Sequence, residues 1–300
     1  MEQFEVTLSS GEKVKGRFWP APLGKANLTI QTGMNEHATR YDDLARFMNE
    51  HGVNVWCLDA LGQGLNAESV DTLQRWPQDG FAKNVEAIHL MVLRAKENGL
   101  PTTQMGHSMG SFMTQSLIER FPRCADKIVL CGSNGGQPAL MLLAYGLAKM
   151  QVKESNWNEP NKNLSNLALG GYAKSIKNRK TDCDWLSFDE DNVKAYIDDP
   201  YCGHEDTNGF WLEFFKGMTT IWTRRGLKRI VSDEKILIIA GDADPVGRNG
   251  KGPKWLKKTY QKLGVKDVSL ILYSHMRHEV HNEGERRHEV YEDLLRFIEK

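Results

Sequence analysis

Short apolar segments with the composition of β-strands alternate with longer segments of helical periodicity along most of the chain. Residues 53–58 and 127–131 form two such strand-like segments, and residues 81–97 between them carry apolar side chains at helical spacing. Strands that alternate with helices pair in parallel, because a crossover helix returns the chain to the same end of the sheet. The sequence therefore predicts an α/β fold with a mostly parallel central sheet and helices on both faces.

Other segments extend this pattern toward both ends of the chain. Residues 3–19 alternate around a Ser-Ser-Gly turn and predict a hairpin. The further predicted strands are 26–30, 103–105, 235–240 and 269–273, and the further predicted helices are 41–52, 108–120, about 253–263 and 285–299.

The alternation stops between about residues 134 and 229. This stretch is rich in helix formers and holds four of the eight Trp, but it contains no convincing strand. Open α/β sheets bind ligands outside the carboxyl ends of their strands, so we expect a helical insertion over that edge. The predicted organisation is a core of residues 1–133 and 230–300, with a helical lid of residues 134–229.

Composition excludes several classes of function. The 300 residues include 39 Lys+Arg and 39 Asp+Glu, so the formal net charge is zero. Neither a nucleic-acid partner nor a polybasic membrane anchor is expected from this balance. No apolar run approaches about 18 residues, and residues 1–5 lack the pattern of a secretory signal. Five scattered Cys without a CxxC pair are typical of reduced thiols, so we expect a cytoplasmic protein.

The pentapeptide Gly-His-Ser-Met-Gly at residues 106–110 matches the pattern G-x-S-x-G and lies between a predicted strand and a predicted helix. This pattern places a serine on a sharp strand-to-helix turn, and the small flanking residues prevent a steric collision there. The N-terminus of the following helix adds positive potential where an oxyanion would form. Ser108 is therefore the candidate nucleophile.

A serine hydroxyl is a poor nucleophile at neutral pH and needs a base, together with an acid that orients the base. In this type of fold both follow the serine in the chain, after later strands. The penultimate predicted strand is followed by Asp242 and Asp244, and the last one by His275 and His278. Spacing alone does not decide between the two acids or between the two histidines.

A metal site has little support in the sequence. His278, Glu279 and His281 come one residue short of the H-E-x-x-H pattern of zinc hydrolases. We interpret His281 as an exposed loop residue, and we expect neither a metal nor a cofactor.

These features resemble the monoacylglycerol lipase and lysophospholipase group of α/β-hydrolases, and the resemblance covers nearly the whole chain. It rests on seven separate motifs, which together are far more specific than any single one. The motifs are Gly33–His37 with Arg40 and Tyr41, Asp59 with Gly62 and Gly64, Gly106–Ser111, Asp184–Ser187, Asp199–Gly203, Gly241–Asp244, and Arg277–Glu279 with Asn282 and Glu283.

The resemblance implies an α/β-hydrolase fold with a helical lid. It implies Ser108 as the nucleophile, Asp244 as the acid and His278 as the base. It also implies an oxyanion hole formed by the backbone N–H groups of Met34 and Met109. Individual substrate-binding residues and the oligomeric state are not identified by the sequence.

Two segments depart from the pattern of the group. Gln31 and Thr32 precede Gly33, where the group has an apolar residue and a histidine. After Asp59, residues 61–66 read Leu-Gly-Gln-Gly-Leu-Asn, where the group has Arg-Gly-His-Gly-x-Ser. We interpret the second departure as structural and the first as one that affects rate or substrate.

The expected reaction is the hydrolysis of carboxylic esters through an acyl-enzyme. The expected substrates are monoacylglycerols, lysophospholipids or other small-molecule esters with one acyl chain. Phe210, Phe214 and Met218 recur at helical spacing in the predicted lid and predict an apolar pocket above Ser108. We also expect transient contact of the lid with a membrane or micelle surface.

Two other functions remain as alternatives. An iminopeptidase-like or other acyl hydrolase could use the same machinery, with an acidic cluster in the lid to hold an amine; the candidates are Asp182, Asp184, Asp189, Glu190 and Asp191. A non-catalytic binding protein on a hydrolase scaffold is the second alternative, and it is motivated by Gln31 and Thr32.

Overall fold

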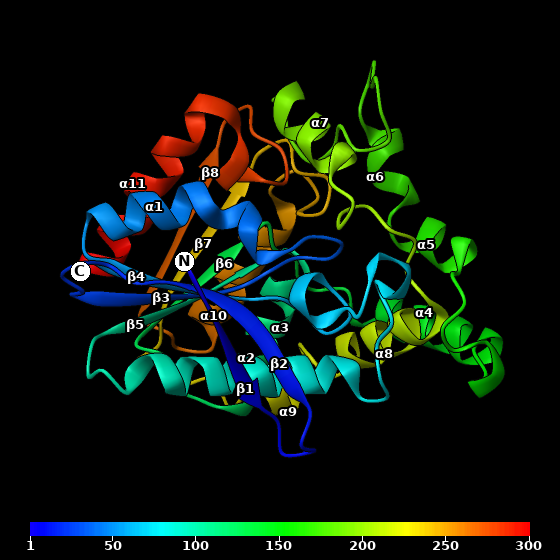
Figure 1. The fold of residues 1–300 in the computed structure, drawn as a ribbon, viewed down its shortest axis with the longest axis horizontal. Coiled ribbons are helices and arrows are strands. Elements are labelled where there is room, and N and C mark those ends of the chain that lie inside the picture. The colour runs from blue at the N-terminus through cyan, green and yellow to red at the C-terminus, as the bar shows by residue number, and fades with distance from the viewer.

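The computed structural model describes residues 1–300 and contains one eight-stranded sheet with helices on both faces (Figure 1). The strand order is β1-β2-β4-β3-β5-β6-β7-β8. Strand β2 runs antiparallel to both of its neighbours, and every pair from β4 to β8 is parallel. The predicted α/β-hydrolase fold with a mostly parallel sheet is confirmed. The strands are β1 Glu2–Thr7, β2 Lys13–Trp19, β3 Ala26–Gln31, β4 Val53–Leu58, β5 Thr102–His107, β6 Lys127–Cys131, β7 Lys235–Gly241 and β8 Asp267–Tyr273.

Strand β5 is longer than the predicted segment 103–105 because its polar residues find partners inside the sheet. Its position between β3 and β6 buries every one of its residues. Thr29 on β3 donates its hydroxyl proton to the side chain of Gln104 at 2.7 Å, and Asn27 donates to the Thr102 hydroxyl at 3.1 Å. Buried polar groups that satisfy one another in this way cost little, so the apolar pattern of a central strand is not needed here.

Helices α1 Asp42–Glu50 and α11 Arg287–Glu299 cover one face of the sheet, and α2 Gly80–Lys96, α3 Met109–Arg120 and α10 Lys251–Lys262 cover the other (Figure 1). Helix α1 buries one side, where Leu44 and Met48 pack with Leu294 of α11. On the opposite face Val85 of α2 and Leu117 of α3 belong to a second apolar cluster. The sheet therefore separates two layers of core, as expected for a parallel sheet.

Between β6 and β7 the chain forms six α-helices, one short 3-10 helix and no strand. The α-helices are α4 Pro138–Gln151, α5 Lys162–Ala168, α6 Gly170–Ser175, α7 Glu190–Asp198, α8 Asn208–Met218 and α9 Arg224–Leu227. Figure 1 shows α4 to α8 gathered beyond one end of the sheet. We call residues 134–229 the helical insertion. Phe210 and Trp211 of α8 belong to the same apolar cluster as α2 and α3, so no break in packing separates the insertion from the core.

Six short 3-10 helices complete the structure, at Ala38–Tyr41, Gly64–Asn66, Val70–Thr72, Glu154–Asn156, Val280–Asn282 and Gly284–Arg286. Among all the helices, none combines the length and the hydropathy needed to cross a membrane.

Candidate active site

Ser108 occupies the turn between β5 and α3, with φ of 51° and ψ of −117°. This left-handed region is strained for a residue with a side chain, and such strain is concentrated at functional sites. Two glycines allow the turn: a Cβ atom on Gly106 would collide with the carbonyl of Gly110, and one on Gly110 would collide with the carbonyl of Gln31. The Ser108 N–H donates to the Cys131 carbonyl of β6 at 2.9 Å, which anchors the turn to the sheet.

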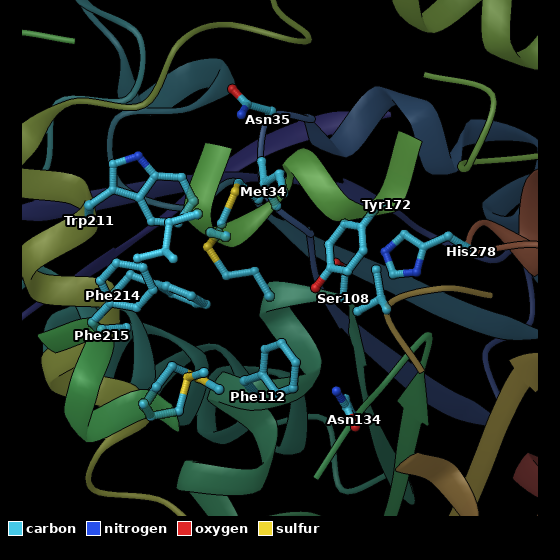
Figure 2. Close-up of a pocket in the computed structure, with 18 of the residues that line it drawn as sticks. Met34, Asn35, Ser108, Phe112, Asn134, Tyr172, Trp211, Phe214, Phe215 and His278 are labelled. Carbon is cyan, nitrogen blue, oxygen red and sulfur yellow. The ribbon is translucent and has the colours of Figure 1, made fainter. Parts of the chain in front are cut away.

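Ser108 lies in a mostly apolar cavity of about 200 Å³ beneath the helical insertion (Figure 2). Of the 29 residues that line this cavity, 21 are hydrophobic, so the expected apolar pocket is present. Phe214 and Met218 line it as predicted, whereas Phe210 faces the core beneath α8. The other eight residues of the lining are Asn35, Glu36, His107, Ser108, Asn134, Gln137, His278 and Glu279.

His278 and Asp244 are in contact in the loops after β8 and β7. His278 Nδ1 lies 3.1 Å from Asp244 Oδ1, and both residues are buried. The same carboxylate oxygen accepts the N–H of Val246 at 2.8 Å, which fixes its orientation. A proton on Nδ1 would leave Nε2 as an acceptor, and Nε2 has no hydrogen-bond partner in the protein. Ser108 and His278 line the same cavity (Figure 2) without a hydrogen bond between them; such bonds often tighten only when substrate binds.

The other two candidates from the sequence lie elsewhere. Asp242 and His275 are both exposed, and the Asp242 carboxylate accepts the backbone N–H of His275 at 2.9 Å. Neither residue lines the cavity that contains Ser108. The geometry therefore brings Asp244 and His278, and not Asp242 and His275, to the candidate nucleophile.

The loop of residues 33–37, which we call the oxyanion loop after the role expected of Met34, passes beside the candidate nucleophile. A Cβ atom on Gly33 would lie 3.1 Å from the Ser108 Cβ. Met34 and Met109 both line the cavity. Met109 is the first residue of α3, so its N–H has no acceptor within the helix. The N–H of Met34 makes no hydrogen bond to the backbone of the protein. Both N–H groups are thus available for an oxygen atom of a ligand.

Gln63 fixes the position of the oxyanion loop through three hydrogen bonds. Its side-chain oxygen accepts the N–H of Asn35 at 2.8 Å. Its amide nitrogen donates to the carbonyls of Gly33 at 2.9 Å and Glu36 at 3.2 Å. Thr32, in contrast, is fully buried, does not line the cavity and donates its hydroxyl proton to the Leu58 carbonyl at 3.3 Å. The contacts thus connect the second departure, at Gln63, with the oxyanion loop, and the effect of either departure on rate or substrate stays a prediction.

Replacing Gln63 with leucine is expected to lower kcat by about 10- to 100-fold with a smaller change in KM, because the oxyanion loop loses its support. Thr32→Val, which removes only a hydroxyl, is expected to stay within about threefold of the parent. Steady-state kinetics on a p-nitrophenyl ester, with thermal unfolding to verify folding, make the comparison. A Gln63→Leu rate within about threefold of the parent would show that the side chain of Gln63 does not support the oxyanion loop.

The oxyanion loop itself contains a buried carboxylate, that of Glu36. Glu36 accepts hydrogen bonds from the N–H of Gly33, from the Tyr41 hydroxyl at 2.8 Å and from His107 Nδ1 at 2.9 Å, and pairs with Arg40 at 3.2 Å. Burial alone would raise its pKa, but His107 and Arg40 outweigh burial and hold the pKa of Glu36 well below its ordinary value. Glu36 is therefore ionised and fully paired.

Glu279, the residue after His278, is paired in the same way. Both of its carboxylate oxygens accept hydrogen bonds from the Arg40 guanidinium, at 2.7 and 2.8 Å. Although burial acts to raise it, the pKa of Glu279 is lowered to about 2 by Arg40. Neither acidic residue of the cavity lining is thus free to bind an amine.

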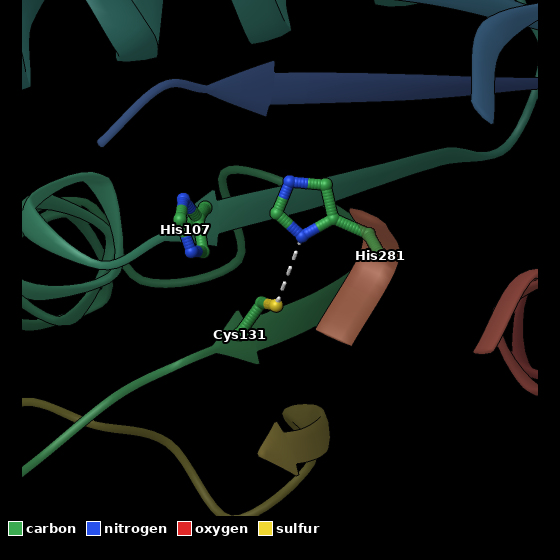
Figure 3. Close-up of side chains that lie close together, drawn as sticks. All are labelled: His107, Cys131 and His281. Carbon is green, nitrogen blue, oxygen red and sulfur yellow. Dashed lines mark hydrogen bonds between the residues drawn. The ribbon is translucent and has the colours of Figure 1, made fainter. Parts of the chain in front are cut away.

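His281 is fully buried, so the interpretation of this residue as exposed is wrong. Its ring stacks on Tyr41 with centroids 4.9 Å apart, and its Nδ1 lies 3.9 Å from Cys131 Sγ (Figure 3). Burial, followed by the neighbouring His107, lowers the pKa of His281 to about 3. The pKa of His107 is raised, because Glu36 outweighs the opposing effect of burial. His281 is thus neutral in the folded protein at neutral pH.

The depressed pKa of His281 predicts a loss of stability in acid. Between about pH 6.5 and about pH 3 the unfolded chain takes up a proton at this residue that the folded chain does not, so the free energy of unfolding falls with falling pH. Its contribution is fully present above pH 6.5. In His281→Phe, which retains a ring against Tyr41, the difference in unfolding free energy between about pH 7.5 and about pH 4.5 should shrink by roughly 2–3 kcal/mol.

Urea unfolding of the parent, His281→Phe and His51→Phe at both pH values measures this difference. His51 is exposed at the end of α1, and its replacement is expected to leave the pH dependence of the parent unchanged. If the unfolding free energies of the parent and of His281→Phe change equally between the two pH values, the assignment of a neutral buried imidazole is contradicted.

Two groups of side chains could offer ligand atoms to a metal. His107, Cys131 and His281 form one group, and His37, Asp199 and Cys202 form the other. Each group contains hydrogen bonds or contacts of its own: His107 Nδ1 bonds Glu36, His281 Nδ1 contacts Cys131, and His37 Nε2 pairs with Asp199 at 2.8 Å. We propose no metal at either group.

The acidic cluster of the insertion lies away from the candidate nucleophile. Asp184, Glu190 and Asp191 line a separate hollow of mostly polar residues. Asp184 accepts the N–H groups of Lys180 and Thr181, and Asp189 caps the N-terminus of α7. None of the five acidic candidates, Asp182 included, lines the cavity that contains Ser108.

Comparison with known proteins gives a consistent result. Residues 24–285 match the Hydrolase_4 family, described as serine aminopeptidase, S33. The chain is 26% identical over 281 residues to a monoacylglycerol lipase of Mycolicibacterium smegmatis, covering 90% of this chain and 87% of that protein. It is 24% identical over 288 residues to a monoglyceride lipase homolog of Monkeypox virus, covering 94% and 91%. The structure of a thermostable carboxyl esterase from Bacillus coagulans in complex with glycerol superposes with a TM-score of 0.90 and 26% identity, covering 99% of this chain and 97% of that one.

Proposed function

The chain belongs to the Hydrolase_4 family, serine aminopeptidase S33, and is a carboxylic ester hydrolase; we propose that it cleaves esters with a single acyl chain, such as monoacylglycerols or lysophospholipids. The observation that carries the proposal is the position of Ser108. It sits on a strained turn, in an apolar cavity that it shares with a histidine bonded to a buried aspartate.

In the proposed mechanism Ser108 Oγ attacks the ester carbonyl while His278 Nε2 takes the hydroxyl proton. Asp244 holds the imidazole with the proton on Nδ1 and stabilises the positive charge that develops on it. His278 then donates the proton to the alcohol oxygen, the C–O bond breaks and the alcohol leaves. Water repeats the sequence on the acyl-enzyme and releases the fatty acid.

The N–H groups of Met34 and Met109 would bind the oxyanion of the tetrahedral intermediate. Donors that are already oriented when charge develops cost no reorganisation in the transition state, which makes them effective. The contacts of Gln63 and Glu36 support this role, because they hold the loop on which Met34 lies.

The apolar walls of the cavity support an acyl chain as the non-reacting part of the substrate. Five aromatic side chains of the cavity wall are those of Phe112, Trp211, Phe214, Phe215 and Trp222, and apolar side chains of α4 also line the cavity. We propose that the helical insertion, residues 134–229, acts as the lid that encloses this chain. The paired state of Glu36 and Glu279 and the remote acidic cluster argue against an amine-binding aminopeptidase.

The hydrolysis of glycerol monoesters from butanoyl to octadecanoyl tests this function. We expect kcat/KM to rise with chain length, because each added CH₂ that the cavity buries contributes up to about 0.8 kcal/mol. Aminoacyl p-nitroanilides serve as the rival substrates. Preferential cleavage of the nitroanilides, or a preference for the shortest ester, would overturn the proposal for a single long acyl chain.

We further propose that the outer surface of α4 contacts a membrane or a micelle. Leu140, Leu142, Leu143 and Met150 are exposed on this helix, and two of them, Leu140 and Leu143, also line the cavity. Exposed apolar groups at the mouth of an apolar cavity would let a single-chain lipid pass from an interface to Ser108 without crossing water.

Replacing Leu142 and Met150 together with glutamate is expected to reduce binding to anionic phospholipid vesicles by about 10-fold or more, since two exposed apolar side chains are lost from the contact. Neither residue lines the cavity, so cleavage of a soluble short-chain ester should be retained. Leu93→Glu, at an exposed leucine of α2, is the matched control. Unchanged vesicle sedimentation of the double variant would contradict the proposed contact surface.

A further inference from the structure

A tyrosine of the insertion reaches the cavity beside the candidate nucleophile. Tyr172 belongs to α6 and lines the same cavity as Ser108 and His278. Its ring packs against Trp185 with centroids 5.3 Å apart, and Trp185 in turn packs against His278 at 5.1 Å. In Figure 2 the Tyr172 hydroxyl points toward the side of the cavity where Ser108 lies.

The Tyr172 hydroxyl has no partner within the protein. The hydrogen bonds of this residue involve only its backbone, through the Ser175 hydroxyl and the Leu169 carbonyl. Burial, with a further contribution from Asp244, raises the pKa of Tyr172 to about 12. The hydroxyl therefore keeps its proton at neutral pH and can donate it in a hydrogen bond. Tyr172 is half-buried, and because no protein group accepts from its hydroxyl, a bound ligand can supply the acceptor.

The proposed reaction has oxygens on two sides of the scissile carbon. The carbonyl oxygen becomes the oxyanion and lies at the N–H groups of Met34 and Met109. The alcohol oxygen must lie near His278, because it receives the proton from Nε2. The Tyr172 ring packs against Trp185, which packs against His278, and the Tyr172 hydroxyl points toward Ser108 (Figure 2). An alcohol oxygen bound between Ser108 and His278 would therefore lie in the part of the cavity that this hydroxyl faces.

We propose that the Tyr172 hydroxyl donates a hydrogen bond to the alcohol oxygen of the bound ester, the atom that leaves with the alcohol. The inference rests on the proposed function. In this step Tyr172 keeps its proton: the C–O bond of the tetrahedral intermediate breaks, its electron pair stays with the alcohol oxygen, and His278 supplies the proton that this oxygen takes. The hydrogen bond stabilises the charge on the oxygen as the bond lengthens.

This role makes the contribution of Tyr172 depend on the leaving group. The alkoxide of glycerol or ethanol is a poor leaving group, so a hydrogen bond to its oxygen lowers the barrier. p-Nitrophenolate spreads its charge over the ring and leaves without such help. If Tyr172 has this role, its replacement lowers kcat/KM for alkyl esters more than kcat/KM for the nitrophenyl ester of the same acid.

The experiment measures kcat/KM of the parent, Tyr172→Phe and Tyr145→Phe on the dodecanoyl esters of glycerol, ethanol and p-nitrophenol. Tyr145 lies on α4, is half-buried and does not line the cavity. We expect Tyr172→Phe to lose about 10- to 100-fold on the glycerol and ethyl esters and less than about threefold on the nitrophenyl ester, with Tyr145→Phe close to the parent on all three.

Three results would overturn the inference. An equal loss on all three esters would mean that Tyr172 only supports Trp185 and His278. A loss confined to the glycerol ester would place the hydroxyl at the head group, and no loss would exclude the contact. If the parent cleaves the ethyl ester but not the glycerol ester, the proposed substrate class fails while the ethyl ester still tests Tyr172. If the parent cleaves none of the three, both proposals fail.

Discussion

Replacing His278 with alanine is expected to lower kcat by about 10⁴- to 10⁶-fold, whereas His275→Ala is expected to stay within about threefold of the parent. His278 is buried, lines the cavity of Ser108 and is bonded to Asp244, so its loss leaves no base for the serine proton. His275 is exposed in the same loop, and only its backbone N–H contacts Asp242.

The two histidine variants form a matched pair, because they lie three residues apart after the same strand. Steady-state kinetics on a p-nitrophenyl ester give kcat of each variant relative to the parent, and circular dichroism verifies that the variants are folded. A folded His278→Ala variant that keeps more than about a tenth of the parent rate would remove His278 from the mechanism. A collapse of activity in His275→Ala alone would move the base to that residue.

Replacing Asp244 with asparagine is expected to lower kcat by about 10³- to 10⁴-fold, because a neutral amide cannot stabilise the positive charge that develops on the His278 imidazole. The Asp244 Oδ1 atom also accepts the N–H of Val246, a bond that an asparagine oxygen can retain. The loop should therefore keep its conformation, and the loss should appear in kcat with little change in stability.

Asp242→Asn is the control for this variant, and it is expected to remain within about threefold of the parent. Asp242 is exposed, and its carboxylate makes a single hydrogen bond, in which it accepts the backbone N–H of His275. The pH dependence of kcat in both variants completes the measurement. Equal losses at positions 242 and 244 would undo the assignment of the acid.

Most of the core was predictable from the sequence because the alternation of strands and helices reflects burial on both faces of the sheet. The exception is β5, where Thr102 and Gln104 are buried and bonded to polar groups of β3, which an apolar pattern cannot reveal. In the insertion only the absence of strands was predictable. Helices such as α5 and α6 are too short to show a clear helical periodicity.

The candidate site was predictable to the extent that it depends on strand ends. The motif around Ser108 identified the turn, and the ends of the last two strands gave two candidates for the acid and two for the base. In the structure one candidate of each pair is buried at the cavity and the other is exposed. The support of the oxyanion loop by Gln63 was not predictable, since residues 30 positions apart meet only through packing. The same holds for His281, which is covered by Tyr41 of a distant segment, and for Tyr172.

The identity of the residue that forms the covalent bond is the most direct test of the proposed function. A fluorophosphonate probe, followed by digestion and mass spectrometry of the labelled peptide, identifies that residue. We expect a single label on Ser108, lost in Ser108→Ala and retained in Ser116→Ala, whose serine is buried in α3 outside the cavity. A folded protein that takes up no label, or a label on another serine that persists in Ser108→Ala, would contradict the role of Ser108 as nucleophile.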